Sequence, residues 1–295
     1  MKVRKRMIFL FLLPASTLYL VFFLFPAVWA FYFSVFDWSG FGESKVFIGL
    51  GNYLELMNDD LFWTSMTNTI KILFLGGFIT LAVAFFMTIL FSTKIRGKKF
   101  FRAMIFMPNV IATIALTTLW AFIYNPKFGL LTNFFAALGF EELSKVLWTA
   151  GDKVFYAMLI ALIWIQVGFM VVLLLAGADK IPFEFYEAAK IEGANIWQMF
   201  IRITIPLVWD VITVAVVFWS IWALKVFEFP YAFFGITPPT SIYTVGIYMY
   251  IMGFGKRDPI YRLGYATAIG VVLLLVVIAV ILVLRRVMRR EVYQY

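Results

Sequence analysis

The sequence has no cysteine and no histidine. The chain therefore cannot form a disulfide, an iron–sulfur cluster, a zinc site with His or Cys ligands, or a Ser-His-Asp triad. A GxxxxGK[ST] phosphate loop is also absent, so we expect no ATP site of the P-loop kind. The sequence predicts no catalytic residue, no metal site and no cofactor bound by this chain. If ATP and Mg²⁺ are used, a separate subunit must hold them.

Charged residues are scarce as well. Of the 295 residues, 14% are charged, 64% are hydrophobic and 20% are aromatic. An ordinary soluble domain is about 25% charged and about 45–50% apolar. This excess of apolar residues cannot be hidden in one soluble core, because a soluble surface needs polar cover. The composition excludes a soluble enzyme and predicts an integral membrane protein.

Long charge-free runs predict the membrane spans, since about 20 apolar residues are needed to cross about 30 Å of hydrocarbon. Five runs are long enough: Met7–Phe36, Ile72–Thr93, Ala103–Pro126, Val154–Ala178 and Leu263–Leu284. A sixth run, Val211–Leu224, has only 14 residues, or about 21 Å of helix. Its flanks are apolar, so we expect one span that includes ionisable residues. The prediction is an all-α, polytopic membrane protein with six transmembrane helices.

Basic residues indicate the orientation of these spans. Sixteen of the 25 basic residues gather in the short segments of one side: Lys2, Arg4, Lys5, Arg6, Lys94, Arg96, Lys98, Lys99, Arg102, Lys180, Lys190, Arg202, Arg285, Arg286, Arg289 and Arg290. Both termini are therefore expected in the cytoplasm. The larger loops, near residues 37–66, 127–153 and 229–262, are expected outside. The basic clusters are interpreted as bilayer anchors, which makes nucleic acid an unnecessary partner.

The cytoplasmic segment between the fourth and fifth spans carries the strongest motif. Pro182 suits the start of a short helix, and Gly193 suits the position just after its end. Asn195 is a good cap for a second helix, and Pro206 marks the start of the fifth span. The segment therefore predicts two short helices joined by a turn.

Three residues of the first short helix suit a docking surface. Ala188 and Ala189 leave the surface shallow, and Glu187 beside them is available to a cationic partner. The alternative is an amphipathic helix that rests on the membrane. Glu187-Ala188-Ala189, followed by Gly193 and by Ile203-Thr204-Ile205-Pro206, resembles the EAA loop of ABC importer permeases. Ile205 stands where that family usually has Leu.

The resemblance extends along nearly the whole chain. It is similar to the first of the two permease subunits of carbohydrate-uptake systems, through Phe47–Tyr53, Phe101-Arg102, Pro108, Leu119-Trp120, Phe128–Asn133 and Gly264–Ala268. The segment Gly235–Pro239 departs from the family pattern, so that outer loop does not indicate the substrate. The resemblance implies the type I ABC importer transmembrane fold.

The resemblance also implies an organisation of the chain and a set of partners. Residues 1–66 would form the N-terminal tail, the first span and the first outer loop. Residues 67–285 would form the transmembrane domain, with the coupling loop at 179–206, and residues 286–295 a basic tail. The partners would be a second permease subunit, two cytoplasmic ABC ATPase subunits, an extracytoplasmic solute-binding protein, a sugar-like substrate and the lipid bilayer of the cell membrane. Glu187 would engage a basic residue of the ATPase, and Gly193 would set the bend.

Polar and aromatic residues within the spans are candidates for the substrate pathway, because polar groups are costly there. They are Gln166, Trp219, Trp222, Lys225, Glu228, Tyr124 and Asn125. Each has a structural alternative: a hydrogen bond between helices for Gln166, and packing or interfacial anchoring for the tryptophans. Lys225 and Glu228, spaced i,i+3, are expected to share a helical face and could form an ion pair.

Other functions remain open at this point. An ABC permease could carry a polyamine, a phosphate ester or a peptide instead of a sugar. A membrane-embedded enzyme would need a carboxylate pair or a histidine cluster facing a cavity, and the five charge-free spans contain neither. An ion-coupled carrier would leave the EAA-like loop unexplained.

Overall fold

The computed structural model describes residues 5–42, 44–92, 96–235, 237–256 and 260–289. These residues divide into two compact units, one of residues 1–62 with 246–275 and one of residues 63–245 with 276–295. Lys2, Arg4, Lys94 and Arg290, which contribute to the predicted orientation, lie outside the described residues. So do Ile236 of the divergent segment that is predicted to lie outside and residues 290–295 of the predicted basic tail.

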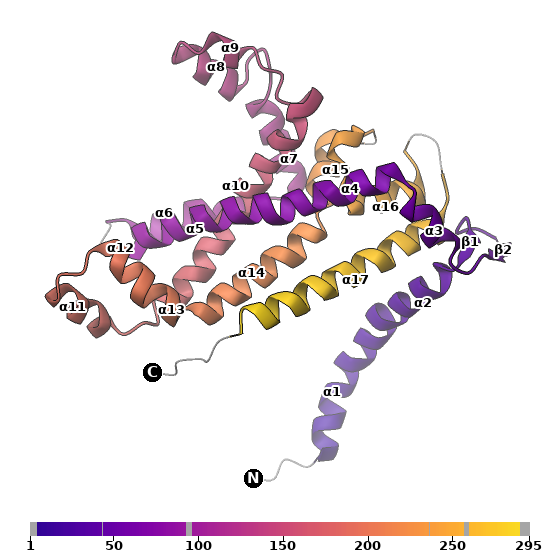
Figure 1. The fold of residues 1–295 in the computed structure, drawn as a ribbon, viewed down its shortest axis with the longest axis horizontal. Coiled ribbons are helices and arrows are strands. Elements are labelled where there is room, and N and C mark those ends of the chain that lie inside the picture. Colours follow the sequence, from indigo (N-terminus) through magenta and orange to yellow (C-terminus); the bar gives the residue numbers. More distant parts are fainter. Residues whose placement is uncertain (1–4, 43, 93–95, 236, 257–259, 290–295) are drawn as a thin grey trace. The chain divides into compact units, whose positions relative to one another are not determined.

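Long apolar helices dominate both units (Figure 1). By length and composition, the described residues hold five helical stretches that could cross a bilayer: Met7–Phe33, Asp60–Phe91, Gly151–Ala178, Trp209–Phe234 and Leu263–Val287. The pair Lys98–Asn109 and Thr113–Ile123, bent by 99°, provides a sixth crossing if it is counted as one span. The predicted polytopic helical fold is confirmed, and the predicted count of six holds with this bent pair.

The first unit contains the first span and several shorter elements. Its elements are α1 (Lys5–Tyr19), a π-helical turn (Leu20–Leu24), α2 (Phe25–Phe33), β1 (Phe36–Trp38), β2 (Lys45–Phe47), α3 (Gly51–Met57), the start of α4 (Asp60–Lys71), most of α16 (Val245–Phe254) and the first half of α17 (Leu263–Val287). The π-helical turn ends two residues before Pro26, which lacks an N–H for the regular helical bond.

A small antiparallel sheet departs from the all-α prediction. Strands β1 and β2 pair Phe36 with Phe47 and Trp38 with Lys45. The chain reverses between them through Gly40 and Gly42, whose φ angles of +94° and +72° are open to glycine. The loop expected over residues 37–66 is thus largely structured, by this hairpin, α3 and the start of α4.

A polar cluster fastens α3, α4, α16 and α17 together within the first unit. Asp59 caps α4 by accepting from the backbone N–H groups of Leu61 and Phe62 at 2.9 and 3.1 Å. Its other carboxylate oxygen accepts from the hydroxyls of Tyr248 and Tyr265. Partial burial raises the pKa of Asp59, but these hydrogen bonds outweigh it and hold the pKa below its ordinary value of 3.8. Asp59 is thus kept ionised.

A bidentate ion pair lies beside this cluster. The guanidinium of Arg262 donates to both carboxylate oxygens of Glu55, at 2.7 and 2.6 Å. Hydrogen bonding to Arg262 holds the pKa of Glu55 below its ordinary value of 4.5. The guanidinium also lies 4.5 Å from the centre of the Tyr265 ring. The start of α17 is therefore joined to α3 by charge and to Asp59 through Tyr265.

The depressed pKa of Asp59 predicts a specific acid sensitivity. A carboxylate whose pKa is lower in the folded state stabilises the fold above its unfolded pKa, and that stability is lost as the pH falls through the folded pKa. We expect the unfolding temperature to fall below about pH 4, and Asp59→Asn to lower it at neutral pH and to weaken this acid dependence. Thermal unfolding of the purified protein from pH 7 to pH 3 measures both effects. Asp152→Asn, a loop control, should behave like the wild type; equal effects of both variants would contradict the assignment.

The second unit is the helical bundle that carries the candidate site. Its elements are most of α4, a π-helical turn (Ile72–Gly76), α5 (Gly77–Ser92), α6 (Lys98–Phe106), a 3-10 turn (Met107–Asn109), α7 (Thr113–Ile123), α8 (Leu130–Ala137), α9 (Glu141–Ser144), a 3-10 turn (Gly151–Lys153), α10 (Val154–Ala178), α11 (Phe183–Ile191), α12 (Ile196–Met199), a π-helical turn (Phe200–Thr204), α13 (Ile205–Leu207), α14 (Trp209–Leu224), α15 (Glu228–Phe234), a 3-10 turn (Thr240–Ile242) and the second half of α17. Helix α10 packs against both α5 and α14 (Figure 1).

Two predicted spans differ from the structure. The second begins at Asp60, twelve residues before Ile72, because α4 continues into α5 through a π-helical turn. The third, expected as one helix over Ala103–Pro126, is broken between α6 and α7. Pro108 accounts for the end of α6 at Phe106 and the change to a 3-10 turn, since its ring removes a helical N–H and clashes with the preceding turn. The side-chain amide of Asn109 then donates to the carbonyl of Ile165 in α10 at 2.7 Å.

Gly168 allows α10 to approach this broken span closely. A Cβ at Gly168 would overlap the backbone carbonyl of Ile105 in α6, which has no side-chain freedom to yield. Gly168→Ala is therefore expected to lower stability by about 1–3 kcal/mol despite the better helix propensity of alanine. Yield and thermal unfolding in detergent measure this. Gly253→Ala is the matched control, because its Cβ would meet the Ala266 Cβ at an ordinary 3.5 Å. Equal stability of the two variants would contradict the packing argument.

Candidate functional site

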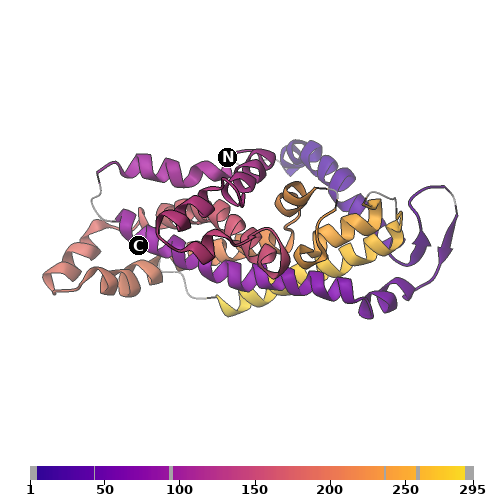
Figure 2. The same cartoon turned by 90° about the horizontal axis from the view of Figure 1, so that it is seen from above.

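The segment that follows α10 forms the predicted pair of short helices. Helices α11 and α12 lie together at one end of the bundle, beyond the end of α10 (Figure 1, Figure 2). Pro182 is the N-cap of α11, so the helix begins at Phe183, one residue later than predicted. A π-helical turn and α13 then lead into α14, with Ile203 and Pro206 half-buried along this path. The predicted local structure of the loop is therefore present.

Gly193 makes the turn between these helices. Its φ of +81° lies in the left-handed region that favours glycine. Its N–H donates to the carbonyl of Lys190 at 3.0 Å, and the N–H of Ala194 donates to the carbonyl of Ala189 at 2.9 Å. This pair of bonds is a Schellman motif. Asn195 then caps α12 through reciprocal 2.9 Å bonds with Gln198.

Most of helix α11 is exposed, including Phe183 and Phe185 at 53% and 44%. Glu187 and Ala188 are exposed, Ala189 is partly exposed, and Ile191, one turn beyond Glu187, is 87% exposed. The opposite side is attached to the bundle, because the hydroxyls of Tyr186 and Thr204 are hydrogen bonded at 2.9 Å. We call Glu187, Ala188 and Ile191 the outward face of α11. An exposed apolar side chain is unfavourable in water, and an exposed carboxylate beside it can pair with a basic residue. The two together suit a surface that binds another protein.

A charged contact fixes the start of this loop. Asp179, directly after α10, pairs with Arg102 at 2.9 Å and with Lys98 at 3.6 Å, both on α6. The loop is thus linked by charge to the first half of the broken span. We did not identify Asp179 from sequence. Its position at the end of a span, on the same side as a basic run, was the available signal.

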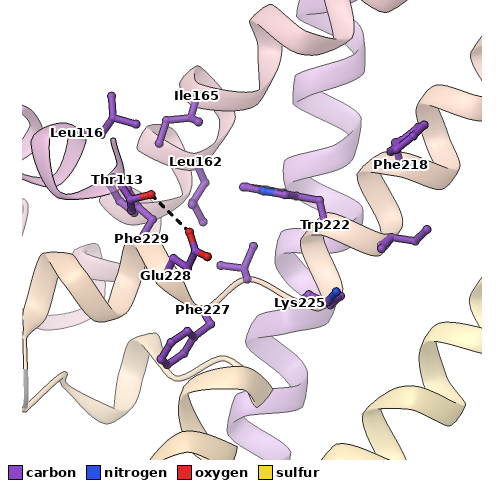
Figure 3. Close-up of a pocket in the computed structure, with 12 residues that line it drawn as sticks. Thr113, Leu116, Leu162, Ile165, Phe218, Trp222, Lys225, Phe227, Glu228 and Phe229 are labelled. Carbon is purple, nitrogen blue, oxygen red and sulfur yellow. Dashed lines mark hydrogen bonds between the residues drawn. The ribbon is translucent and has the colours of Figure 1, made fainter. Parts of the chain in front are cut away.

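A cavity of about 420 Å³ lies between α7, α10, α14 and the start of α15. Its lining is largely apolar and aromatic, with one ammonium, one carboxylate and one hydroxyl (Figure 3). The lining residues are Thr113, Leu116, Leu162, Ile165, Phe218, Ile221, Trp222, Lys225, Val226, Phe227, Glu228 and Phe229. Three of the predicted pathway residues, Trp222, Lys225 and Glu228, are therefore brought to one cavity.

The predicted helical pairing of Lys225 with Glu228 is wrong. Helix α14 ends at Leu224 and α15 begins at Glu228, so the i,i+3 rule of one continuous helix does not apply. Within the part of the chain that the structure describes, no ion pair joins them. Glu228 instead accepts from the hydroxyl of Thr113 at 3.5 Å (Figure 3). Lys225 at a helix C-terminus and Glu228 at a helix N-terminus are each favoured by the helix dipole.

The other predicted pathway residues do not line the cavity, and three of them hydrogen bond to the backbone. Trp219 is 2% exposed, and its indole N–H donates to the carbonyl of Leu73 at 2.8 Å. Tyr124 is 3% exposed and donates to the carbonyl of Ala157 at 2.8 Å. Asn125 accepts from two backbone N–H groups of the following turn. Gln166 is buried in α10 and is not among the cavity's lining residues.

Thr113 is the cavity residue that sequence reasoning missed. It opens α7 immediately after the break at residues 110–112, and its hydroxyl reaches Glu228 across the cavity. A charge-free run gives no indication of a break within it. The sequence therefore does not predict that Thr113, inside such a run, lines a cavity. The proline that precedes it by five residues was the available signal.

Comparison with known proteins places the chain in a family. The family model described as "Binding-protein-dependent transport system inner membrane component" matches residues 81–292. The chain is 36% identical over 276 residues to a "Probable ABC transporter permease protein" of Pyrococcus horikoshii, with 93% of each chain covered. It is 32% identical over 249 residues to the trehalose/maltose transport system permease protein MalF of Thermococcus litoralis, with 83% of each chain covered.

A solved structure has the same fold. It is the crystal structure of a bacterial ABC transporter involved in the import of the acidic polysaccharide alginate. The TM-score is 0.83 at 22% identity, and the match covers 98% of this chain and 97% of that chain. At this level of identity the similarity establishes the arrangement of the helices.

Proposed function

The chain belongs to the family of binding-protein-dependent transport system inner membrane components, and we propose that it carries a sugar or sugar-like solute into the cytoplasm as one subunit of an ATP-driven importer. It is a multi-pass membrane protein and a transport subunit, not an enzyme. The observation that carries the proposal is the exposed outward face of α11, next to the glycine turn at the end of the bundle. A lipid-resting helix would leave that turn and its exposed carboxylate without a role.

Helix α11 would transmit the movements of an ATPase partner. Glu187 would engage a basic residue of the ATPase, with Ile191 in the same contact. Two links join the loop to the spans: Asp179 to α6 through Arg102, and Tyr186 to Thr204 ahead of α14. A rigid displacement of α11 would thus move α14, which lines the cavity, and α6, which leads into α7 at the same cavity.

The cavity would form part of the solute pathway. Trp222 supplies an aromatic face, and Thr113, Lys225 and Glu228 supply polar groups of three kinds. Sugars bind through such combinations of an apolar ring face and hydroxyls with convergent polar partners. Trp219, Tyr124 and Asn125 do not line the cavity; they would stabilise the surrounding helices through hydrogen bonds to the backbone. Gln166, buried in α10, would stabilise the packing of that helix.

The named solute of a relative supports the sugar assignment. The Thermococcus litoralis relative, which this chain matches over 83% of its length, carries trehalose and maltose by its name. We propose a solute of the same class, delivered by an extracytoplasmic binding protein. A second permease subunit would complete the pathway, and two cytoplasmic ATPase subunits would use ATP and Mg²⁺. Both termini of this chain would lie in the cytoplasm.

An anionic sugar or a phosphate ester is the second candidate, favoured by Lys225. This ammonium lines the cavity without an ion pair to Glu228, so a carboxylate or phosphate on the solute would gain a charge-assisted bond. On this candidate, Lys225→Gln should weaken competition by phosphorylated sugars about tenfold while leaving neutral sugars nearly unaffected. Uptake competition in proteoliposomes measures the ratio. Equal effects on both classes would remove the phosphate-ester candidate.

Uptake into proteoliposomes tests the proposal itself. The chain is co-expressed with its neighbouring genes, and the purified complex is reconstituted with a radiolabelled sugar panel and the binding protein outside. We expect uptake only with ATP and Mg²⁺ inside, and no effect of collapsing the proton and sodium gradients. Uptake without ATP that follows an ion gradient would establish a carrier and overturn the proposal.

A further inference from the structure

The far end of α17 meets the beginning of α14 in the second unit. The indole N–H of Trp209 donates to the backbone carbonyl of Met288 at 2.8 Å, which fixes the two helix ends together. Beside this contact lies a hollow of about 810 Å³. It is lined by Asp210 and Thr213 of α14 and by Arg285, Arg286, Met288 and Arg289 at the end of α17. The transport mechanism proposed above uses none of these residues.

The hollow has an excess of positive charge. Three guanidinium groups face one carboxylate there. All three arginines are exposed, and none is paired with Asp210 within the part of the chain that the structure describes. The hydroxyl of Thr213 donates to the carbonyl of Trp209 at 3.0 Å, so it adds no free donor. The lining therefore carries a net positive charge, which suits an anionic ligand.

Arginine suits a phosphodiester in particular. Its planar guanidinium offers paired donors that match two phosphate oxygens, and several such groups share one phosphate. Arg285 and Arg286 lie in the last turn of α17, where the helix dipole also favours positive charge. That dipole stabilises the arginines themselves but leaves their donors available to a ligand.

The apolar surroundings favour a lipid over a free phosphate ion. Leu282, Val283 and Val287 are exposed to 61%, 60% and 74% on the same and the preceding turn of α17. The charges mark the end of a helix long enough to cross the bilayer, so the hollow lies at headgroup level. We propose that this hollow is a specific site for an anionic phospholipid, with its phosphodiester held by Arg285, Arg286 and Arg289 and its acyl chains along α17. Basic pockets between helices at this depth bind such headgroups in other membrane proteins.

Binding of defined lipids to the purified complex tests this site without any transport measurement. Native mass spectrometry in detergent titrates phosphatidylglycerol and phosphatidylcholine against the wild type and R285Q/R286Q/R289Q. We expect retained phosphatidylglycerol on the wild type and at least a tenfold weaker affinity in the triple variant. Asp210→Asn should bind phosphatidylglycerol more tightly, because it removes the one negative charge of the hollow.

A matched variant separates this site from general surface charge. R96Q/K99Q/K180Q removes three exposed positive charges from the same predicted side of the membrane and should retain phosphatidylglycerol like the wild type. Equal losses of bound phosphatidylglycerol in both triple variants would show that general surface charge, and no specific site, holds the lipid. That result would overturn the proposal. Displacement of the lipid by excess inorganic phosphate would do the same in favour of a free-anion site. Because no readout depends on ATP or sugar, the result is independent of the proposed import.

Discussion

Gly193→Val is expected to uncouple transport from ATP hydrolysis while leaving the spans intact. The Schellman turn holds Gly193 at a φ of +81°. A β-branched residue is strained there by about 1–3 kcal/mol, which favours other loop conformations by about 5- to 150-fold. Nothing lies within 4 Å of the position of an added Cβ, so no steric clash with the bundle contributes. ATP-driven uptake should fall at least about tenfold, because α11 no longer presents Glu187 and Ile191 in register.

A second glycine of the same chain provides a close control. Gly139, after α8, has a φ of +80°, open space around its Cβ position and the same pair of Schellman bonds, at 3.0 and 2.9 Å. Gly139→Val therefore carries the same backbone strain in a predicted outer loop. It should keep the ratio of sugar transported to ATP hydrolysed. Equal loss of coupling in both variants would show that strain anywhere in the chain is sufficient, and would contradict the coupling role of α11.

Trp222→Ala is expected to weaken solute transport through the cavity. Trp222 is half-buried and lines the cavity wall, with its ring 5.3 Å from that of Trp219. Loss of a large aromatic contact in a binding site costs about 2 kcal/mol, or about 30-fold in affinity. We expect the uptake rate at limiting sugar to fall by about this factor. The unfolding temperature should change little, because the ring is not fully enclosed.

A variant of the neighbouring Trp219 distinguishes a role in solute binding from a role in helix packing. Trp219 lies against Gly76 and Gly77, and its N–H satisfies the Leu73 carbonyl. Trp219→Phe should remove this buried hydrogen bond and lower stability by about 0.5–1.5 kcal/mol, with the sugar dependence of uptake unchanged. If Trp219→Phe altered the sugar dependence and Trp222→Ala did not, the two roles would be reversed.

The spans that sequence predicted best are those with no ionisable interruption. Helix α10 occupies residues Val154–Ala178, the same bounds as the charge-free run. The charge-free run gives no sign of helix α4, because Lys71 ends the run, although Asp59 is a good N-cap and starts the helix earlier. The bounds of a charge-free run thus predict the part of a helix that crosses the hydrocarbon. Capping residues find where the helix begins.

The local structure of the proposed coupling loop was predictable because its geometry depends on nearby residues. Gly193, Asn195 and Gln198 specify their turn and cap through contacts within a few residues. The cavity was predictable only in part. Trp222 is visible as an aromatic residue in a span, but the Thr113–Glu228 bond joins residues 115 positions apart and depends on the break before α7. The ion pair expected for Lys225 and Glu228 failed for the same reason, since the helix ends between them.

ATP hydrolysis by the co-purified complex in lipid tests the account most directly. The account predicts that a second permease and a P-loop ATPase co-purify with this chain, and that binding protein loaded with sugar stimulates hydrolysis. Glu187→Lys should keep the permease pair but lose the ATPase and the stimulation, because it reverses the charge on the outward face of α11. Purification of the chain without an ATPase, or full stimulation of the Glu187→Lys complex, would contradict the account.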